Sequence, residues 1–332
     1  MTQPSPHAPE LLGQMALLNE QVDGSLLGVP VRYRSNSATV IAVAARALAV
    51  WRDLPRALSA AGPPVQVAVV VHPLGAGDPV LPPAGHFVAR AYGDTFLAAS
   101  GGNLLTANLA TGSATAFVTP ALVADEPNLR HRVIERLGLL LASDRDRTPL
   151  PAAGIVRDGR AVLLVSPSAA EKSTLCYACV QVGFSLLAED NVYVSLARGL
   201  RVWGQPGPLH LPPEAARYFP ELAALVPQVG ADGTPKIATD GAAHWPERLA
   251  THADRSVVCL LAQSPGQASR LESVSADEAS VALCHAYTPD LDRLRERWPA
   301  VAHALAVGGA YRLHVGADPH SAAALLAPLA EC

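Results

Sequence analysis

Apolar side chains recur along the first part of the chain in patterns typical of one sheet and two helices. Residues 24–35 alternate as a strand, residues 39–61 carry apolar positions at helical spacing, and residues 65–71 form a β-branched run between prolines. The pattern then predicts an antiparallel meander of four short strands, over residues 86–92, 95–99, 104–109 and 114–118. A helix over residues 127–143 is expected to end this block.

The pattern changes after residue 148, where strands and helices begin to alternate. Two strands over residues 152–156 and 161–165 are joined by a turn at residues 157–159, and a helix over 173–182 precedes a strand over 185–194. The later predicted elements are a short helix, a strand, two helices, a strand and a last helix, over residues 213–218, 257–262, 276–287, 289–298, 311–315 and 320–329. This alternation predicts an α/β layer fold.

These patterns give an expected division of the chain. Residues 1–20 read as a loose leader, residues 21–148 as an N-terminal α+β domain and residues 149–332 as an α/β domain. The boundary is placed in the charged, proline-containing linker over residues 144–151.

Composition narrows the class of protein. Half of the 332 residues are apolar and 16% are charged, which excludes a disordered or fibrous chain. The sequence has no uncharged apolar run of about 18 to 20 residues, and its first ten residues are polar, so we expect a cytoplasmic protein without a membrane partner. A net charge of −4 argues against a nucleic-acid partner. Five cysteines are too few for a disulfide framework in a chain of this length.

Residues 161–175 contain the segment that most resembles a ligand-binding motif. An apolar strand enters a loop of small residues that ends in Lys172-Ser173-Thr174 and opens a helix, the context of a phosphate-binding GxxxxGK[ST] loop. Of the 25 basic residues only Lys172 and Lys236 are lysines, so each is a candidate for a position that arginine cannot fill. Ser166 and Glu171 stand where the two glycines of the motif belong.

This segment resembles the HPr kinase-like proteins, whose catalytic domain shares a P-loop architecture with phosphoenolpyruvate carboxykinase. The resemblance rests on residues 166–175, on Gly183-Phe184 and on Glu189-Asp190 after the next strand. Its best-matched region is about 129–240, with fainter similarity toward both ends of the chain. It implies an HPr kinase/phosphoenolpyruvate carboxykinase-like P-loop domain preceded by a smaller α+β domain, and the family suggests a homo-oligomer.

The resemblance also implies roles for the site residues. ATP and Mg²⁺ would be the cofactors of an active member. The cofactor-binding candidates are Ser166, Ser168, Lys172, Ser173, Thr174 and Lys236. Ser173 and Asp190 would hold the metal, and Glu189 with Asp190 would form the catalytic pair. For Lys172-Ser173-Thr174 the alternative is a helix N-terminus without a ligand. For Glu189-Asp190 it is a polar strand end, and for Lys236 a solvated loop lysine.

Departures from the family pattern weaken the case for ATP binding. Ser166, Ala169 and Glu171 replace glycines of the pattern. A carboxylate on Glu171 about 4–5 Å from a phosphate oxygen would cost on the order of 3–4 kcal/mol at an effective dielectric constant of about 20. We therefore expect a pseudokinase or partner-binding protein with weak or no ATP binding. The alternatives are an active kinase that phosphorylates a hydroxyl of a peptide, protein or small molecule, and a scaffold without any ligand.

Three further features have plainer expected explanations. Cys176 and Cys179 form a C-x-x-C inside the helix, where we expect them to pack in the core. Arg130 and Arg132 could reach a phosphate, but surface salt bridges are expected. The charged stretch over residues 290–297 is expected to be a solvated helix face with i,i+3 and i,i+4 ion pairs.

Overall fold

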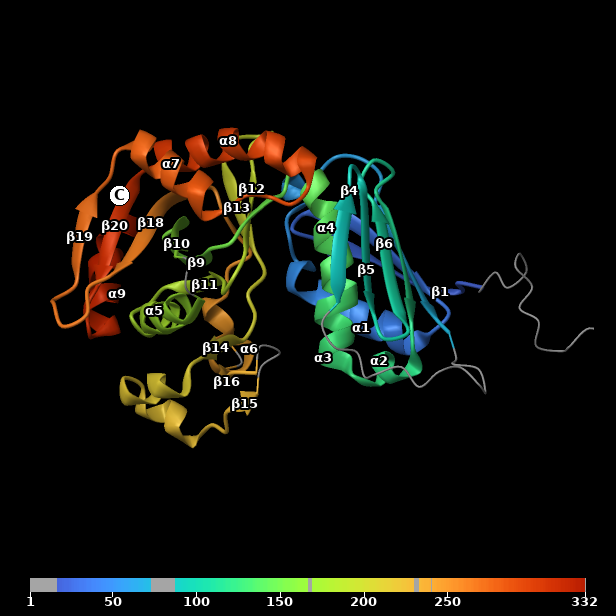
Figure 1. The fold of residues 1–332 in the computed structure, drawn as a ribbon, viewed down its shortest axis with the longest axis horizontal. Helices are drawn as coiled ribbons and strands as arrows, with labels where there is room; N and C mark the ends of the chain where they lie inside the picture. Colours follow the sequence, from blue (N-terminus) through green and yellow to red (C-terminus); the bar gives the residue numbers. More distant parts are fainter. Residues whose placement is uncertain (1–16, 73–86, 167–168, 230–232, 240, 332) are drawn as a thin grey trace, which may run out of the picture.

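The structure is a computed structural model that describes residues 17–72, 87–166, 169–229, 233–239 and 241–331. Figure 1 shows two blocks, one built around a blue-to-green sheet and the other from the yellow-to-red part of the chain. Most of the predicted leader lies outside the described residues, and the first strand begins at Glu20. Within the described ranges, no helix combines the length and the apolar character that a membrane crossing requires.

The first block contains a seven-stranded sheet with the order β1-β2-β3-β7-β6-β5-β4. Its strands are β1 (Glu20–Leu26), β2 (Val29–Ser35), β3 (Val65–Val71), β4 (Val88–Tyr92), β5 (Thr95–Ser100), β6 (Asn103–Asn108) and β7 (Ser113–Val118). The predicted antiparallel meander is confirmed in β4 to β7. The single strand predicted over 24–35 is wrong, because Leu27 and Gly28 adopt positive φ and turn the chain into the β1–β2 hairpin.

Helices cover one face of this sheet. They are α1 (Ala38–Leu48), α2 (Pro120–Ala124), α3 (Glu126–Leu129) and α4 (Arg136–Asp144), with a π-helix, η3 (Arg130–Glu135), joining α3 to α4. The first helix ends at Leu48, well before its predicted limit at residue 61, and tightens into a 3-10 turn over Ala49–Trp51. The helix predicted over 127–143 is interrupted by η3. The spacing of apolar residues does not indicate the wider turn of a π-helix.

The second block has three layers. Its central sheet has the order β11-β9-β10-β18-β20-β19, in which β10, β18 and β20 run parallel. The strands are β9 (Ala153–Arg157), β10 (Arg160–Val165), β11 (Ser185–Ala188), β18 (Arg255–Gln263), β19 (Arg270–Ser273) and β20 (Ala310–Val315). Val162 and Leu164 of β10 face α5 (Ala169–Gln181) and α9 (Pro319–Glu331), whereas Leu163 faces α7 (Ala276–Ala286) and α8 (Asp292–Val307). A mixed α/β fold results, with the predicted β9–β10 hairpin confirmed.

Two small sheets complete the block. One has the order β17-β13-β12-β8 and the other β14-β16-β15. Their strands are β8 (Thr148–Leu150), β12 (Val192–Ser195), β13 (Arg201–Gly204), β14 (Leu209–Leu211), β15 (Gln228–Val229), β16 (Pro235–Thr239) and β17 (His252–Ala253). The single strand predicted over 185–194 is wrong: β11 and β12 belong to different sheets, and the chain leaves one for the other at Glu189-Asp190-Asn191.

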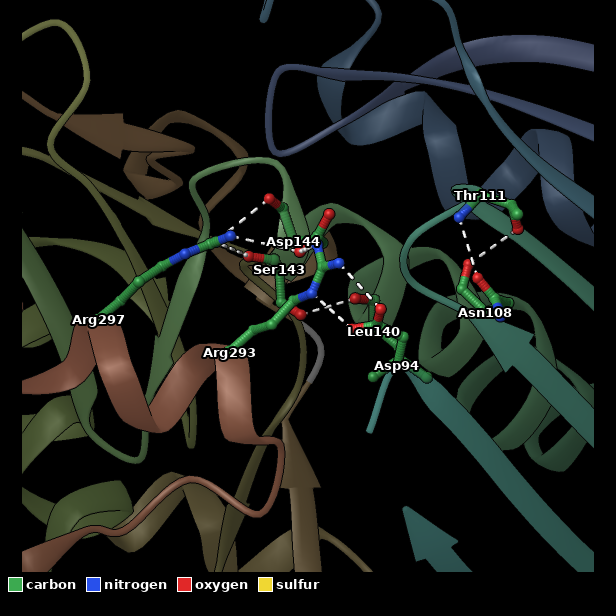
Figure 2. A network of polar contacts seen from close by, with 8 residues as sticks. All are labelled: Asp94, Asn108, Thr111, Leu140, Ser143, Asp144, Arg293 and Arg297. Atoms are coloured by element: carbon green, nitrogen blue, oxygen red, sulfur yellow. Dashed lines mark hydrogen bonds and ion pairs between the residues drawn. The ribbon is translucent and has the colours of Figure 1, made fainter. Parts of the chain in front are cut away.

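Charged groups join the two blocks. Figure 2 shows Arg293 and Arg297 of α8 directed at Asp144, and Arg293 also reaches Asp94. The expected solvated helix face over 290–297 is therefore partly wrong, although Arg295 pairs with Asp292 as predicted.

The residues next to Asp144 strengthen this seam. Arg147 is buried, donates from Nε to Leu27 O over 2.7 Å and lies 4.4 Å above the ring of Trp203. Asp146 adopts a left-handed backbone with φ of 59°, and its carboxylate accepts hydrogen bonds from the N–H groups of Leu196 and Ala197. The predicted linker thus fastens the blocks to each other, and the expected division into domains stays a prediction.

Candidate functional site

The helix that follows β10 begins earlier than predicted. α5 starts at Ala169 instead of residue 173, which leaves three residues, 166–168, between strand and helix. Alanine and glutamate are strong helix formers, and no glycine interrupts the run from Ala169 to Glu171. The side chains of residues 169–171 and the whole of Ser168 lie outside the described part of the chain. The backbone that a phosphate loop would use is therefore largely the first turn of a helix.

The two central residues of the motif form hydrogen bonds within the protein. Lys172 is only 6% exposed, and its Nζ donates to the carbonyl of Ser166 over 3.1 Å. Ser173 is also buried and donates from Oγ to Glu189 Oε1 over 2.8 Å. Thr174 lines a separate cavity of about 430 Å³. The predicted phosphate contact and the predicted Mg²⁺ ligand thus both have protein partners here.

Glu189 accepts three hydrogen bonds. Besides Ser173, its carboxylate accepts the backbone N–H of His210 over 2.5 Å and the ring Nδ1–H of His210 over 2.7 Å. The bond to Glu189 is the largest cause of a raised His210 pKa, which partial burial opposes. With both oxygens engaged, Glu189 holds α5 against β14.

Asp190 is the more open carboxylate of the pair. Its pKa is raised, first because it loses hydration and then because Glu189 is a neighbouring negative charge; Lys172, His210 and Lys236 oppose this rise. Asp190 accepts no hydrogen bond from the part of the chain that the structure describes. It lines a cavity of about 450 Å³, the site cavity, together with Ser173, Glu189, His210 and Lys236.

The structure thus brings most predicted site residues together. Ser173, Glu189, Asp190 and Lys236 surround one cavity, and Lys172 is close enough to Asp190 to affect its pKa. Sequence analysis missed His210 as a site residue. The Leu-His-Leu alternation of β14 could have indicated it, because it places the His210 ring on the face of the strand opposite to that of the two buried leucines.

A test of this network is the change Glu189→Gln. The raised pKa of His210 means that its pair with Glu189 stabilises the fold below the unfolded-state pKa of about 6.5, and that this stabilisation is lost as pH rises through the folded-state pKa. In Glu189→Gln we expect the His210 pKa to fall and the free energy of unfolding at about pH 5.5 to drop by about 1–3 kcal/mol. NMR titration of the His210 ring and urea unfolding measure the two effects.

The matched control is Glu214→Gln, which lies in the same cavity without a hydrogen bond to His210. An unchanged His210 pKa in Glu189→Gln, or an equal change in both variants, would contradict the assigned network.

A wider cavity of about 940 Å³, the interblock cleft, lies between the π-helix and the carboxylate pair. From η3 it is lined by Arg130, His131 and Glu135, and from the second block by Glu189 and Asp190. Glu135 is 4% exposed and pairs with Arg130 Nε at 2.6 Å and with His131 Nδ1 at 2.7 Å. Burial raises the Glu135 pKa, but these partners outweigh it and leave the pKa below its usual value.

Outcomes for the remaining candidates differ. The expected Arg130 salt bridge is confirmed, although its partner Glu135 is buried, whereas Arg132 donates to Asn128. Cys176 and Cys179 are fully buried, as expected, and burial raises the pKa of both thiols. Among the described residues, there is no group of three or more histidine, cysteine, aspartate or glutamate side chains arranged to hold a metal ion.

Comparisons with known proteins give little support for a family. No protein-family model matches the chain, and no curated protein sequence matches it. Among solved structures, the HPr(Ser) kinase/phosphatase from Coxiella burnetii matches with a TM-score of 0.29 and 12% identity, over 55% of this chain and 93% of that chain. This likeness is weak and distant, and it does not establish a family for the chain.

Proposed function

We propose that the chain is a diverged HPr kinase-like protein whose nucleotide loop has degenerated, and that it acts as a pseudokinase or partner-binding component with weak or no ATP binding. One observation carries this proposal. Lys172 and Ser173, the residues that would contact phosphate and Mg²⁺, lie in a helix that already begins at Ala169 and form hydrogen bonds to Ser166 and Glu189.

The energetics of phosphate binding support this function. A P-loop surrounds its phosphates with the backbone N–H groups of a whole loop, whereas a helix that begins at Ala169 leaves only the N–H groups of its first turn without an intrahelical partner. A helix N-terminus alone attracts an anion by about 0.3–2 kcal/mol. ATP would also have to displace the bond from Lys172 to Ser166, so the described residues fit MgATP poorly.

The second candidate is an active kinase, and the environment of Asp190 favours it. A carboxyl group with a raised pKa that opens into a cavity is suited to accept a proton from a hydroxyl. In this alternative, Asp190 is better placed than Glu189 to be the base, because both Glu189 oxygens already accept hydrogen bonds. The acceptor hydroxyl would enter through the interblock cleft.

Thermal unfolding with MgATP, MgADP or pyrophosphate tests the choice. A ligand at a concentration one hundred times its Kd stabilises a fold by about 2.7 kcal/mol, which raises Tm by several degrees. We expect no shift at millimolar ligand, for the wild-type chain and for Lys172→Ala alike. A shift of several degrees that Lys172→Ala abolishes would contradict the proposal and support the active kinase.

A further inference from the structure

A second cavity, of about 840 Å³, continues the interblock cleft away from the carboxylate pair. This β4 cavity lies between the edge of the first sheet, α4 and the chain entering α8, and Ala89, Ala91 and Arg136 line it. The two cavities share four lining residues, His131, Glu135, Leu139 and Tyr193. The β4 cavity and the interblock cleft, which Asp190 lines, are therefore neighbours.

One wall of the β4 cavity is a sheet edge. β4 is the outermost strand and, among the described residues, pairs with β5 alone. Tyr92 and Thr95 flank the two-residue turn of this hairpin, so the alternate residues Ala89 and Ala91 have their backbone N–H and C=O groups on the open side. The side chain of Arg90 bonds to Ala89 O but is exposed and can move. Such an edge pairs readily with an extended segment of another chain.

The opposite wall carries a positive charge that has no counter-ion among the described residues. Arg136, the first residue of α4, is half-buried with its guanidinium 5.4 Å from the centre of the Phe96 ring. No carboxylate of the described residues pairs with it. Burial, and then the nearby charge of Arg132, lower its pKa.

The other charges in the β4 cavity leave this cation unmatched. Glu135 is next to Arg136 in sequence, but Arg130 and His131 already pair with its two oxygens. Asp290 is exposed and belongs to the chain before α8, and Arg90 adds a second positive charge from β4. A partly desolvated guanidinium that no described carboxylate pairs with is complementary to a carboxylate, which it can bind through two parallel hydrogen bonds.

We propose that the β4 cavity binds an extended, carboxylate-bearing peptide segment of a partner protein, which adds a strand to β4 and places its carboxylate on Arg136. The proposal deepens the partner-binding role and rests on that proposed function. It gives the partner a chemical class, and it places the bound segment next to the interblock cleft, with which the β4 cavity shares lining residues.

Synthetic peptides test the proposal with the full chain and no nucleotide. The probe is a fluorescent peptide of about eight residues, alternating threonine and valine, acetylated and amidated at its ends, with a central glutamate. Matched probes carry glutamine or lysine instead, and a fourth has glutamine with a free C-terminal carboxylate, which separates a side-chain carboxylate from a terminal one. We expect fluorescence anisotropy to show binding of the glutamate probe or of the free-carboxylate probe, and about tenfold weaker binding of the glutamine and lysine probes that carry no carboxylate.

Variants of the chain test the contributions of Arg136 and of the β4 edge separately. Arg136→Gln should weaken binding of a carboxylate probe by about tenfold to a hundredfold, and Arg136→Lys by less, because lysine keeps the charge without the fork. Ala91→Pro removes an N–H from the open edge and should weaken all probes. The exposed Arg52, outside the cavity, supplies the control Arg52→Gln, which should bind as the wild type does. Bound probe should also slow hydrogen exchange at the amides of Ala89 and Ala91.

Several results would overturn the proposal. These are equal binding of the lysine probe, no binding of any probe, wild-type affinity in Arg136→Gln, or no protection of the β4 amides. Self-association of the chain that Arg136→Gln abolishes would also do so, by assigning the surface to a second copy. The peptide experiments contain no nucleotide, so their outcome does not depend on the thermal unfolding test. A thermal shift with MgATP would contradict the pseudokinase function and leave the peptide results as they are.

Discussion

Replacing Ala169 and Glu171 with glycine should give the chain stronger MgATP binding, if the first turn of α5 is what weakens nucleotide binding as proposed. Each glycine lowers the stability of a helical turn by about 1 kcal/mol relative to alanine, so the first turn of α5 can open into a loop. The change also removes the charge of Glu171 and frees Lys172 from Ser166. We expect isothermal titration calorimetry to show affinity at least about tenfold higher than that of the wild type.

Two controls separate loop opening from general weakening of the helix. Adding Lys172→Ala to the double glycine variant should abolish the new binding, because the only basic side chain of the motif is then gone. Gln181→Gly, at the exposed end of the same helix, should leave nucleotide binding unchanged. A folded double glycine variant that gains no affinity would show that the helical turn is not what blocks the nucleotide.

The change Gly204→Ala should cause a large loss of stability. A Cβ on this residue of β13 would lie 2.2 Å from Leu187 O and 2.6 Å from Leu187 Cγ. Because a backbone oxygen cannot turn aside as a long side chain can, β13 and β11 must move apart. We expect urea unfolding to show a loss of about 3 kcal/mol or more.

The same change should disturb the site, since Leu187 lies two residues before Glu189. We expect the ring signals of His210 to shift in NMR spectra of Gly204→Ala. Gly207→Ala is the matched control in the same segment: no atom lies within 4 Å of its Cβ, so its stability should stay within about 0.5 kcal/mol of the wild type. Equal losses in the two variants would contradict the close packing assigned to Gly204.

Local patterns in the sequence were sufficient to predict several elements. The β-branched run of β3, the meander from β4 to β7 and the hairpin of β9 and β10 depend on residues close together in the chain. The start of α5 could also have been predicted, because Ala169-Ala170-Glu171 favours helix. The resemblance to a glycine-rich loop outweighed that propensity in the prediction.

Other features depend on contacts distant in sequence and left no local signal. The apolar pattern over residues 185–194 continues across Glu189-Asp190, so it does not indicate that β11 and β12 join different sheets. Four of the predicted site residues line the site cavity, but His210 lies 21 residues after Glu189 and reaches its carboxylate only in the folded chain. The sequence likewise does not indicate that Glu135, the neighbour of Arg136, forms its ion pairs with Arg130 and His131 instead.

The conformation of residues 169–172 in solution tests the degenerate-loop proposal most directly. Backbone ¹³C chemical shifts of Ala169 and Ala170, followed by NMR with and without millimolar MgATP, report whether this turn is helical. We predict helical shifts that MgATP leaves unchanged. Loop-like shifts, or helical shifts that convert to loop-like ones when MgATP is added, would contradict the proposal that the nucleotide loop has been lost to the helix.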